Sequence, residues 1–350
     1  MYSCDAAIVR PPAVPREAVT LRAPGRLHLG FLDPTATLGR AFGSFGLVID
    51  GFETAVELSA APADVLEAAT PAAQGELARA ARHLEVLRER SGLRTPLRLR
   101  LLDVLPAHAG LGSGTQLALA VGRAFAQWHR LDVDTPTLAH WLGRGLRSGV
   151  GIAGFDQGGL LVDGGPGADG RPAPLLARLT LPAAWRVLVV QDHSLHGLSG
   201  QREKQALAVL PPLPRPLAAD ICHQVLMRVL PGAAGGEFAP FAAGVSHVQQ
   251  VLGDHFAPAQ GGRYTSPAVG RLLDGIAEAA RGPGGAPGAA VGQSSWGPTG
   301  FAILPSEAQA AALVAEAQAA GRVAPGLSLR IVTARDHGAC LLDARGHRMP

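Results

Sequence analysis

Hydrophobic and polar residues alternate with a period of two near the start of the chain, which predicts strands. Residues 18–33 form the first such segment, and Pro24-Gly25 interrupts it. Residues 43–60 form the second segment. They contain Asp50-Gly51, a typical hairpin signal, so we expect a pair of strands there. A further strand is predicted over residues 97–106, directly before a glycine-rich turn.

Apolar positions at helical spacing predict helices between and after these strands. Residues 75–91 carry an apolar stripe that stops at Gly92, and a second helix should run from Thr115 to about His129. Thr135-Pro136 is typical of a helix cap followed by proline in the first turn. The later part of the chain predicts further strands at residues 185–192, 300–304 and 327–334 and helices at about 200–210, 217–230, 236–252 and 306–320.

This order of elements predicts an α+β protein without strict βαβ alternation, in two domains that meet near residue 180. We expect a flexible extension over residues 1–18, an N-terminal domain over 19–180 and a C-terminal domain over 181–350. A chain of 350 residues with 47% hydrophobic residues has enough apolar surface for two cores.

Composition excludes several classes of protein. The three cysteines are far apart and the net charge is only +3, so neither a zinc site nor a nucleic-acid surface is predicted. No apolar run approaches the roughly 20 residues that span a bilayer, and the N-terminus does not resemble a signal peptide. We therefore expect a cytoplasmic protein that binds neither membranes nor nucleic acids.

The most informative segment is "HAGLGSGTQLALA", residues 108–120. Its glycines allow the backbone to approach an anion, and the helix that follows adds free N–H groups and a partial positive charge. The segment is not a Walker loop, because no Gly-Lys-Ser/Thr follows. It predicts a phosphate site formed by Gly110, Leu111, Gly112, Ser113, Gly114 and Thr115.

Three segments in order, "APGRLHLGF" (23–31), "PAHAGLGSG" (106–114) and "GQSSWGPTGFAIL" (292–304), resemble the three motifs of the GHMP kinase superfamily. The resemblance implies an N-terminal domain like domain 2 of ribosomal protein S5 and a ferredoxin-like C-terminal domain. It also implies a ligand between them, with its phosphates held by the second motif.

The chain departs from the kinases of that superfamily. Their second motif usually ends in a serine that helps to bind magnesium, where this chain has Gly114. Many carry a catalytic aspartate where this chain has Gly151, in the run Ser148-Gly149-Val150-Gly151. Loss of these groups together indicates that the phosphate cradle is kept while phosphoryl transfer is lost.

A narrower resemblance extends over residues 20–345. Segments such as "FGSFGLVIDG" (42–51), "RSGVGIAGFDQGGLLVDGG" (147–165) and "HGLSGQREKQA" (196–206) are similar to the β-ribofuranosylaminobenzene 5′-phosphate synthase family. One departure is Asp336, where we would expect asparagine.

That family is a group of decarboxylating pentosyltransferases of tetrahydromethanopterin biosynthesis. The resemblance implies that phosphoribosyl pyrophosphate is joined to 4-aminobenzoate or 4-hydroxybenzoate, with release of pyrophosphate and CO2 and formation of a C-glycoside. It also implies Mg²⁺ as a cofactor and a homodimer.

This chemistry sets requirements for the site. Preorganised donors and cations must stabilise the departing pyrophosphate, which Gly110 to Thr115 and Arg26 can do. A carboxylate should stabilise the cation-like ribose, and Asp156 is the first choice, with Asp33 and Asp50 as alternatives. Asp156 is about as well explained as a turn residue before two glycines.

The aromatic acceptor needs a partner at its para substituent. His28 and His108 are candidates, since neutral imidazole accepts or donates near neutral pH. His28 is equally well explained as a residue that simply alternates on one face of a strand. His83 is assigned to a helix surface. The remaining substrate-binding candidates are His196, Glu203, Ser294, Ser295, Trp296 and Thr299. Trp296 either stacks on the substrate or wedges the two domains together.

Two other functions stay open at this point. One is a small-molecule kinase that uses ATP, which Gly114 and Gly151 disfavour. The other is a non-catalytic paralogue that binds a sugar phosphate as a sensor.

Overall fold

The computed structural model describes residues 18–167, 171–197, 205–206, 209–343 and 345–348. The expected extension at residues 1–18 therefore lies outside it except for Ala18. Glu203 and most of the predicted helix at 200–210 also lie outside it. Within the described residues, no helix is long and apolar enough to cross a membrane.

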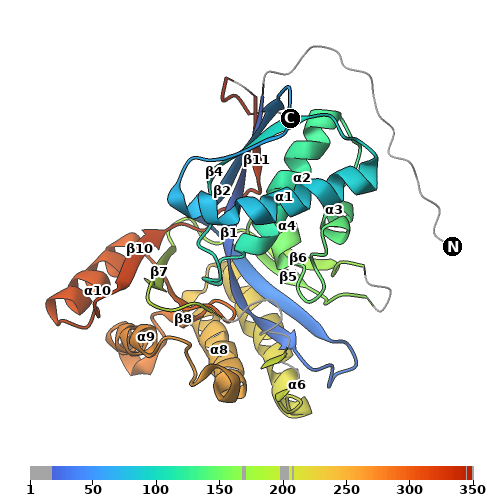
Figure 1. The fold of residues 1–350 in the computed structure, drawn as a ribbon. Coiled ribbons are helices and arrows are strands. Elements are labelled where there is room, and N and C mark those ends of the chain that lie inside the picture. Colours follow the sequence, from blue (N-terminus) through green and yellow to red (C-terminus); the bar gives the residue numbers. More distant parts are fainter. Residues whose placement is uncertain (1–17, 168–170, 198–204, 207–208, 344, 349–350) are drawn as a thin grey trace.

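The first sheet has the strand order β11-β1-β2-β4-β3, and β5 and β6 continue it from β2. All its neighbouring pairs are antiparallel except β3 and β4. Its strands are β1 (Val19–Asp33), β2 (Phe42–Ala60), β3 (Val65–Ala68), β4 (Leu97–Asp103), β5 (Leu160–Asp163), β6 (Leu175–Leu179) and β11 (Cys340–Leu342). Figure 1 shows the long strands β1 and β2 extending from the upper layer of helices towards α8 and α6.

The hairpin expected at Asp50-Gly51 is wrong. Strand β2 passes through both residues without reversing, and only Gly51 has a left-handed φ, of 77°. The two halves of β2 have different partners: Ser44–Leu47 pairs with β5 and Ala55–Ala60 pairs with β4. A single bent strand therefore replaces the predicted pair, because one left-handed residue bends a strand but does not form a two-residue turn.

Helices α1 (Pro71–Ser91), α2 (Ser113–His129) and α4 (Val150–Gln157) pack on this sheet, and α3 (Thr135–Trp141) packs on these helices. Gly92 ends α1 with a φ of 73°, as its position predicts. Asp134, one residue before the predicted cap Thr135, caps α3. The buried face of α2 fills the core between sheet and helices with Leu117, Leu119, Val121 and Phe125.

The second sheet is antiparallel with the order β10-β7-β9-β8. Its strands are β7 (Arg186–Asp192), β8 (Ala290–Gln293), β9 (Thr299–Leu304) and β10 (Leu327–Val332). Counted within this domain the order is 4-1-3-2, which is the ferredoxin-like arrangement that the superfamily resemblance implies.

Helices cover both faces of the second sheet. Leu188 and Val190 pack towards α9 (Pro267–Ala279) and α10 (Glu307–Ala319). The alternate residues Val187 and Val189 belong to a core that includes α8 (Phe238–Gln260). The remaining helices are α6 (Arg215–Gln224), the π-helix η1 (Val225–Val229), α7 (Leu230–Gly235) and the short η2 (Pro283–Gly285). Helix α9 is not predicted from the sequence.

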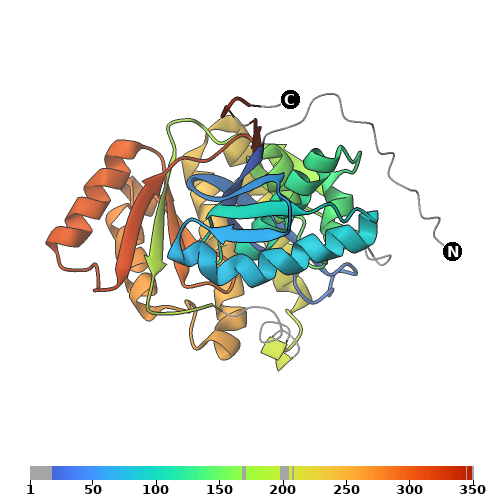
Figure 2. The ribbon, with the colours of Figure 1, turned by 45° about the horizontal axis from the view of Figure 1, so that its top comes forward.

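The chain passes from the first sheet to the second between β6 and β7. The C-terminal segment does not stay in the second domain, however. Strand β11 returns to the first sheet and pairs with Thr20–Arg22 of β1, as Figure 2 shows in dark red and dark blue. One continuous core joins residues of both sheets, including Phe45 and Val187. The two domains are therefore packed as one unit.

Candidate active site

The glycine-rich turn joins β4 to α2 and leaves the start of α2 open. Gly110 and Gly112 have φ values of 86° and 84°, which non-glycine residues rarely adopt. Gly112 occupies the cap position, where no side chain bonds to the helix, and the first turn holds no acidic residue. The Thr115 N–H donates to the Gly112 carbonyl at 3.0 Å. The N–H groups of Ser113 and Gly114 precede this first helical bond, so they and the hydroxyls of Ser113 and Thr115 can face an anion.

Strand β1 brings Arg26 against this turn. The Arg26 backbone N–H donates to the Leu111 carbonyl at 3.1 Å, and its Nη1 donates to the Gly110 carbonyl at 3.3 Å. A Cβ on Gly112 would lie 3.3 Å from the Arg26 guanidinium. The structure thus places Arg26 beside the predicted phosphate site, while the side chain of Leu111 is buried in the core.

The third motif packs directly on the same turn. Ser294 is fully buried, and its Oγ accepts from the His28 backbone N–H at 2.9 Å and donates to the Gly110 carbonyl at 2.7 Å. A Cβ on Gly297 would approach the Ala109 carbonyl carbon to 2.3 Å, so this contact requires glycine. The three motifs that are far apart in the sequence therefore meet at one place.

His108 and the segment around His196 complete this side of the turn. Gly197 N donates to the His108 carbonyl at 3.1 Å, which brings the exposed His196 close to His108. Burial lowers the pKa of His108; Arg79 and His196 act in the same direction, and Glu76 opposes them. His108 is therefore neutral near pH 7. Glu203 lies outside the described residues.

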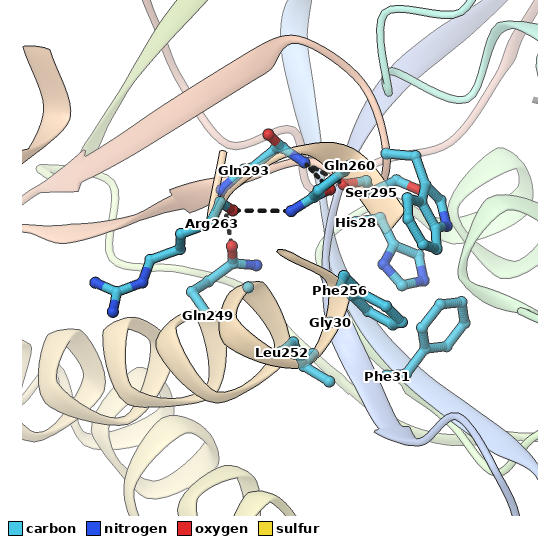
Figure 3. Close-up of a pocket in the computed structure, with 12 residues that line it drawn as sticks. His28, Gly30, Phe31, Gln249, Leu252, Phe256, Gln260, Arg263, Gln293 and Ser295 are labelled. Carbon is cyan, nitrogen blue, oxygen red and sulfur yellow. Dashed lines mark hydrogen bonds between the residues drawn. The ribbon is translucent and has the colours of Figure 1, made fainter. Parts of the chain in front are cut away.

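A narrow pocket lined in part by aromatic rings lies beside His28. Figure 3 shows the rings of His28, Phe31 and Phe256 around the same space. Trp296 is buried, packs on Phe256 at 4.7 Å between ring centres, and lines the pocket with Ser295. Trp296 thus lines a cavity and also contacts helix α8 of its own C-terminal domain. The pocket's polar lining includes Gln249, Gln260, Gln293 and Arg263.

His28 lines this pocket, and its backbone N–H is linked to the glycine-rich turn through Ser294 Oγ. Its side chain is 4% exposed, and its Nε2 has no hydrogen-bond partner among the described residues. Burial lowers the pKa of His28 to about 3, and the charges of Arg26 and Arg147 contribute to this shift. A neutral imidazole with an unused nitrogen is suited to bind a polar group of a ligand.

Two arginines that the sequence analysis did not select lie over the first turn of α2. A Cβ on Gly114 would lie 3.4 Å from Nη1 of Arg144 and 4.0 Å from Nη1 of Arg79. Arg79 comes from α1 and pairs with Glu76 at 3.0 Å. They could not be selected from the sequence, because both are far from the turn along the chain and each resembles an ordinary surface arginine.

The expected magnesium does not fit these residues as a protein-held ion. No group of three or more His, Cys, Asp or Glu side chains is placed to hold a metal anywhere in the described part of the chain. The side of Gly114 faces two guanidinium groups, and their positive charges disfavour a further cation.

The structure places Asp156 away from the turn. Its carboxylate accepts from Thr135 Oγ1 at 2.6 Å, and the same hydroxyl accepts from Arg123 Nη2 at 2.7 Å. Arg123 lies ten residues after Ser113, at roughly 15 Å along α2. Asp156 therefore links α4, α3 and α2, and we do not include it in the reaction.

The alternative carboxylates also have structural partners. Asp33 accepts from the backbone N–H groups of Thr35 and Leu38, and Asp50 accepts from Thr333 Oγ1. Thr299 is fully buried at the start of β9. Asp336 is exposed and pairs with the neighbouring His337.

Asp163 is a buried carboxylate that the sequence analysis missed. It accepts from the backbone N–H groups of Gly149, Val150 and Gly165 at 2.8 to 3.2 Å, and from Ser44 Oγ. It therefore fixes the start of α4. There Gly151 lies beside Thr115, since a Cβ at Gly151 would lie 3.3 Å from Thr115 Cγ2.

Comparison with known proteins agrees with this geometry. Residues 77–160 match the family "GHMP kinases N terminal domain" and residues 246–323 match "GHMP kinases C terminal". A β-ribofuranosylphenol 5′-phosphate synthase from Archaeoglobus fulgidus is 34% identical over 82% of this chain and 88% of its own. The chain belongs to this synthase family of the GHMP kinase superfamily. The synthase of the same name from Methanothermobacter thermautotrophicus is 30% identical, over 87% of this chain and 94% of its own.

Solved structures show the same fold in more distant relatives. A homoserine kinase from Cytophaga hutchinsonii aligns over 96% of this chain and all of its own, with a TM-score of 0.60 and 15% identity. A mevalonate diphosphate decarboxylase from Enterococcus faecalis aligns over 94% of this chain and 99% of its own, with a TM-score of 0.64 and 15% identity. These confirm the predicted two-domain GHMP-kinase-like fold. Because its relatives are synthases of this family, the protein is a transferase.

Proposed function

We propose that this synthase family member joins phosphoribosyl pyrophosphate to a 4-substituted benzoate and releases pyrophosphate and CO2. The observation that carries the proposal is that strand β1 brings an anion site and an aromatic pocket next to each other. Arg26 contacts the turn before α2, and His28, two residues further along β1, lines the pocket with Phe31, Phe256 and Trp296.

The reaction divides between these two parts. The bond between ribose C1 and the pyrophosphate oxygen breaks, and pyrophosphate leaves with the electron pair onto the donors of residues 110–115 and Arg26. The ring carbon that bears the carboxylate then bonds to C1. Loss of CO2 returns its bonding electrons to the ring and restores aromaticity, so no strong base is required.

We propose His28 as the group that hydrogen-bonds the para substituent, since its Nε2 is buried and its imidazole is neutral. The relatives are named for a ribofuranosylphenol product. This favours 4-hydroxybenzoate over 4-aminobenzoate, and with it a role in tetrahydromethanopterin synthesis. Magnesium enters the proposal only as the counter-ion carried by the pyrophosphate of the substrate.

The test is an incubation of the purified protein with phosphoribosyl pyrophosphate, magnesium and carboxyl-labelled 4-hydroxybenzoate, and separately 4-aminobenzoate. We expect CO2 and pyrophosphate in equal amounts, faster with the hydroxy acid. ATP without phosphoribosyl pyrophosphate is the control for kinase activity. Acceptor-dependent ADP formation would contradict the proposal, as would tight phosphoribosyl pyrophosphate binding without product.

A further inference from the structure

The two guanidinium groups above Gly114 are held in an arrangement that is costly without an anion. Arg79 and Arg144 both place Nη1 within 4.0 Å of the point where a side chain at Gly114 would begin. Arg144 is half-buried, and its Nε has no hydrogen-bond partner among the described residues. Burial lowers the pKa of Arg144, and the charge of Arg79 lowers it further. Two like charges that repel each other in a partly buried place favour a multiply charged anion.

Among the described residues, an acidic side chain pairs with only one of these two arginines. Glu76 lies 3.0 Å from Arg79, while Arg144 has no ion-pair partner in the described part of the chain. One guanidinium beside the open first turn of α2 thus keeps its charge for a ligand. Together with the uncapped N–H groups, it provides a fork of donors that matches phosphate oxygens.

A buried histidine holds Arg144 in place. His83, expected on a helix surface, is only 7% exposed, and its Nε2 lies 3.4 Å from Arg144 Nη2. Burial lowers the pKa of His83 to about 4, and Arg144, Arg79 and Arg82 contribute to this shift. The neutral ring therefore accepts from Arg144 and orients it without adding a charge.

We propose that Arg144 and Arg79 bind the pyrophosphate of the donor substrate directly, in the place above Gly114, so that binding needs no protein-held metal ion. The inference rests on the proposed function for the identity of the anion. His83 is a positioning residue for Arg144. The absence of a side chain at Gly114 is what leaves room for the anion between the two guanidinium groups and the helix.

The test is calorimetric titration with inorganic pyrophosphate in EDTA and again in MgCl₂. The wild-type protein should bind in EDTA. Arg144→Gln should weaken binding in EDTA by about tenfold or more, since charged hydrogen bonds are lost. Arg79→Gln should also weaken it, because it removes a positive charge and leaves the Glu76 carboxylate unpaired beside the anion. Arg144→Lys should recover only part of the loss. Arg90→Gln removes a charge from the exposed end of α1 and should bind as the wild type does.

Folding and function are checked separately. Thermal unfolding of each variant shows whether it is folded, and His83→Gln gives a second variant that leaves both arginines intact yet should weaken pyrophosphate binding severalfold. Binding by wild type only in MgCl₂, or unchanged binding by folded Arg144→Gln, would overturn the inference. Product formation by wild type is measured in parallel. If the wild type forms no product but still binds pyrophosphate through these arginines, the proposed transferase reaction is rejected and the proposed anion site is supported.

Discussion

The Oγ of Ser294 donates a 2.7 Å hydrogen bond to the carbonyl of Gly110, across 184 positions of sequence. The same hydroxyl accepts from the His28 backbone N–H, so one buried atom aligns the first, second and third motifs. Ser294→Ala should lower the free energy of unfolding by about 1–3 kcal/mol, because it leaves a buried N–H and a carbonyl unpaired. It should also weaken pyrophosphate binding.

Chemical denaturation and pyrophosphate titration measure these two effects. Ser306→Ala is the matched control, since Ser306 caps α10 and should cost about 1 kcal/mol without changing pyrophosphate affinity. Equal pyrophosphate affinity in Ser294→Ala and wild type would show that the hydroxyl does not position the turn.

Gly110 cannot accept a side chain. A Cβ there would lie 2.2 Å from the Ser294 carbonyl oxygen, and the φ of 86° is unfavourable for alanine. We expect Gly110→Ala to lose several kcal/mol of stability and most activity. Gly143 has a φ of 64° but no atom within 4 Å of an added Cβ, so Gly143→Ala should cost only about 1 kcal/mol. Similar melting temperatures for the two variants would contradict the packing described for the third motif.

The buried neutral His28 makes stability depend on pH. Its pKa is about 3 when folded and near 6.5 when unfolded, so between these values the unfolded chain binds a proton that the folded chain does not. Stability therefore falls as the pH falls below 6.5, by up to about 1.4 kcal/mol per pH unit from this residue.

His28→Gln should remove that contribution. Between pH 7 and pH 5 the stability of the wild type should fall by about 2 kcal/mol more than that of the variant. Urea denaturation at the two pH values measures the difference. His193→Gln, at an exposed position, controls for the loss of an imidazole; if it flattens the profile as much as His28→Gln does, the buried site is not the cause.

The aromatic pocket should affect one substrate only. Phe256→Leu shrinks the ring face that packs on Trp296 and should raise KM for 4-hydroxybenzoate by roughly two- to tenfold, with KM for phosphoribosyl pyrophosphate unchanged. Phe238→Leu makes the same change at the other end of α8, where Phe238 packs on Trp185, and should leave both KM values alone. A rise in KM for phosphoribosyl pyrophosphate instead would place the donor in this pocket.

Local chemistry explains what could be predicted from sequence. Gly110 and Gly112 are required by backbone conformation, and Arg26 lies in the first motif of the superfamily resemblance, so each signal lies in a few adjacent residues. The fold class followed from the order of strands and helices, because each period reports a local preference.

The predictions that failed or were missed depend on where a side chain points and on contacts between residues far apart in the sequence. The sequence around Asp156 says nothing of which neighbour its carboxylate faces, and tertiary packing directs it to Thr135. Arg79, His83 and Arg144 become a cluster only when α1 packs against α2 and the segment after α3. Asp50-Gly51 has hairpin chemistry, yet pairing of β2 with both β4 and β5 keeps the strand continuous.

The pairing of Thr20 with Leu342 makes the beginning of the first strand and the end of the last strand neighbours. Expression of residues 19–180 alone would strip β11 from β1 and expose a bare sheet edge that invites aggregation. The two domains are consequently not separable modules, whatever their borders in sequence. A circular permutant that joins the two ends by a short linker and opens the chain in an exposed loop would keep every strand pair, and it offers a way to place new termini far from the site.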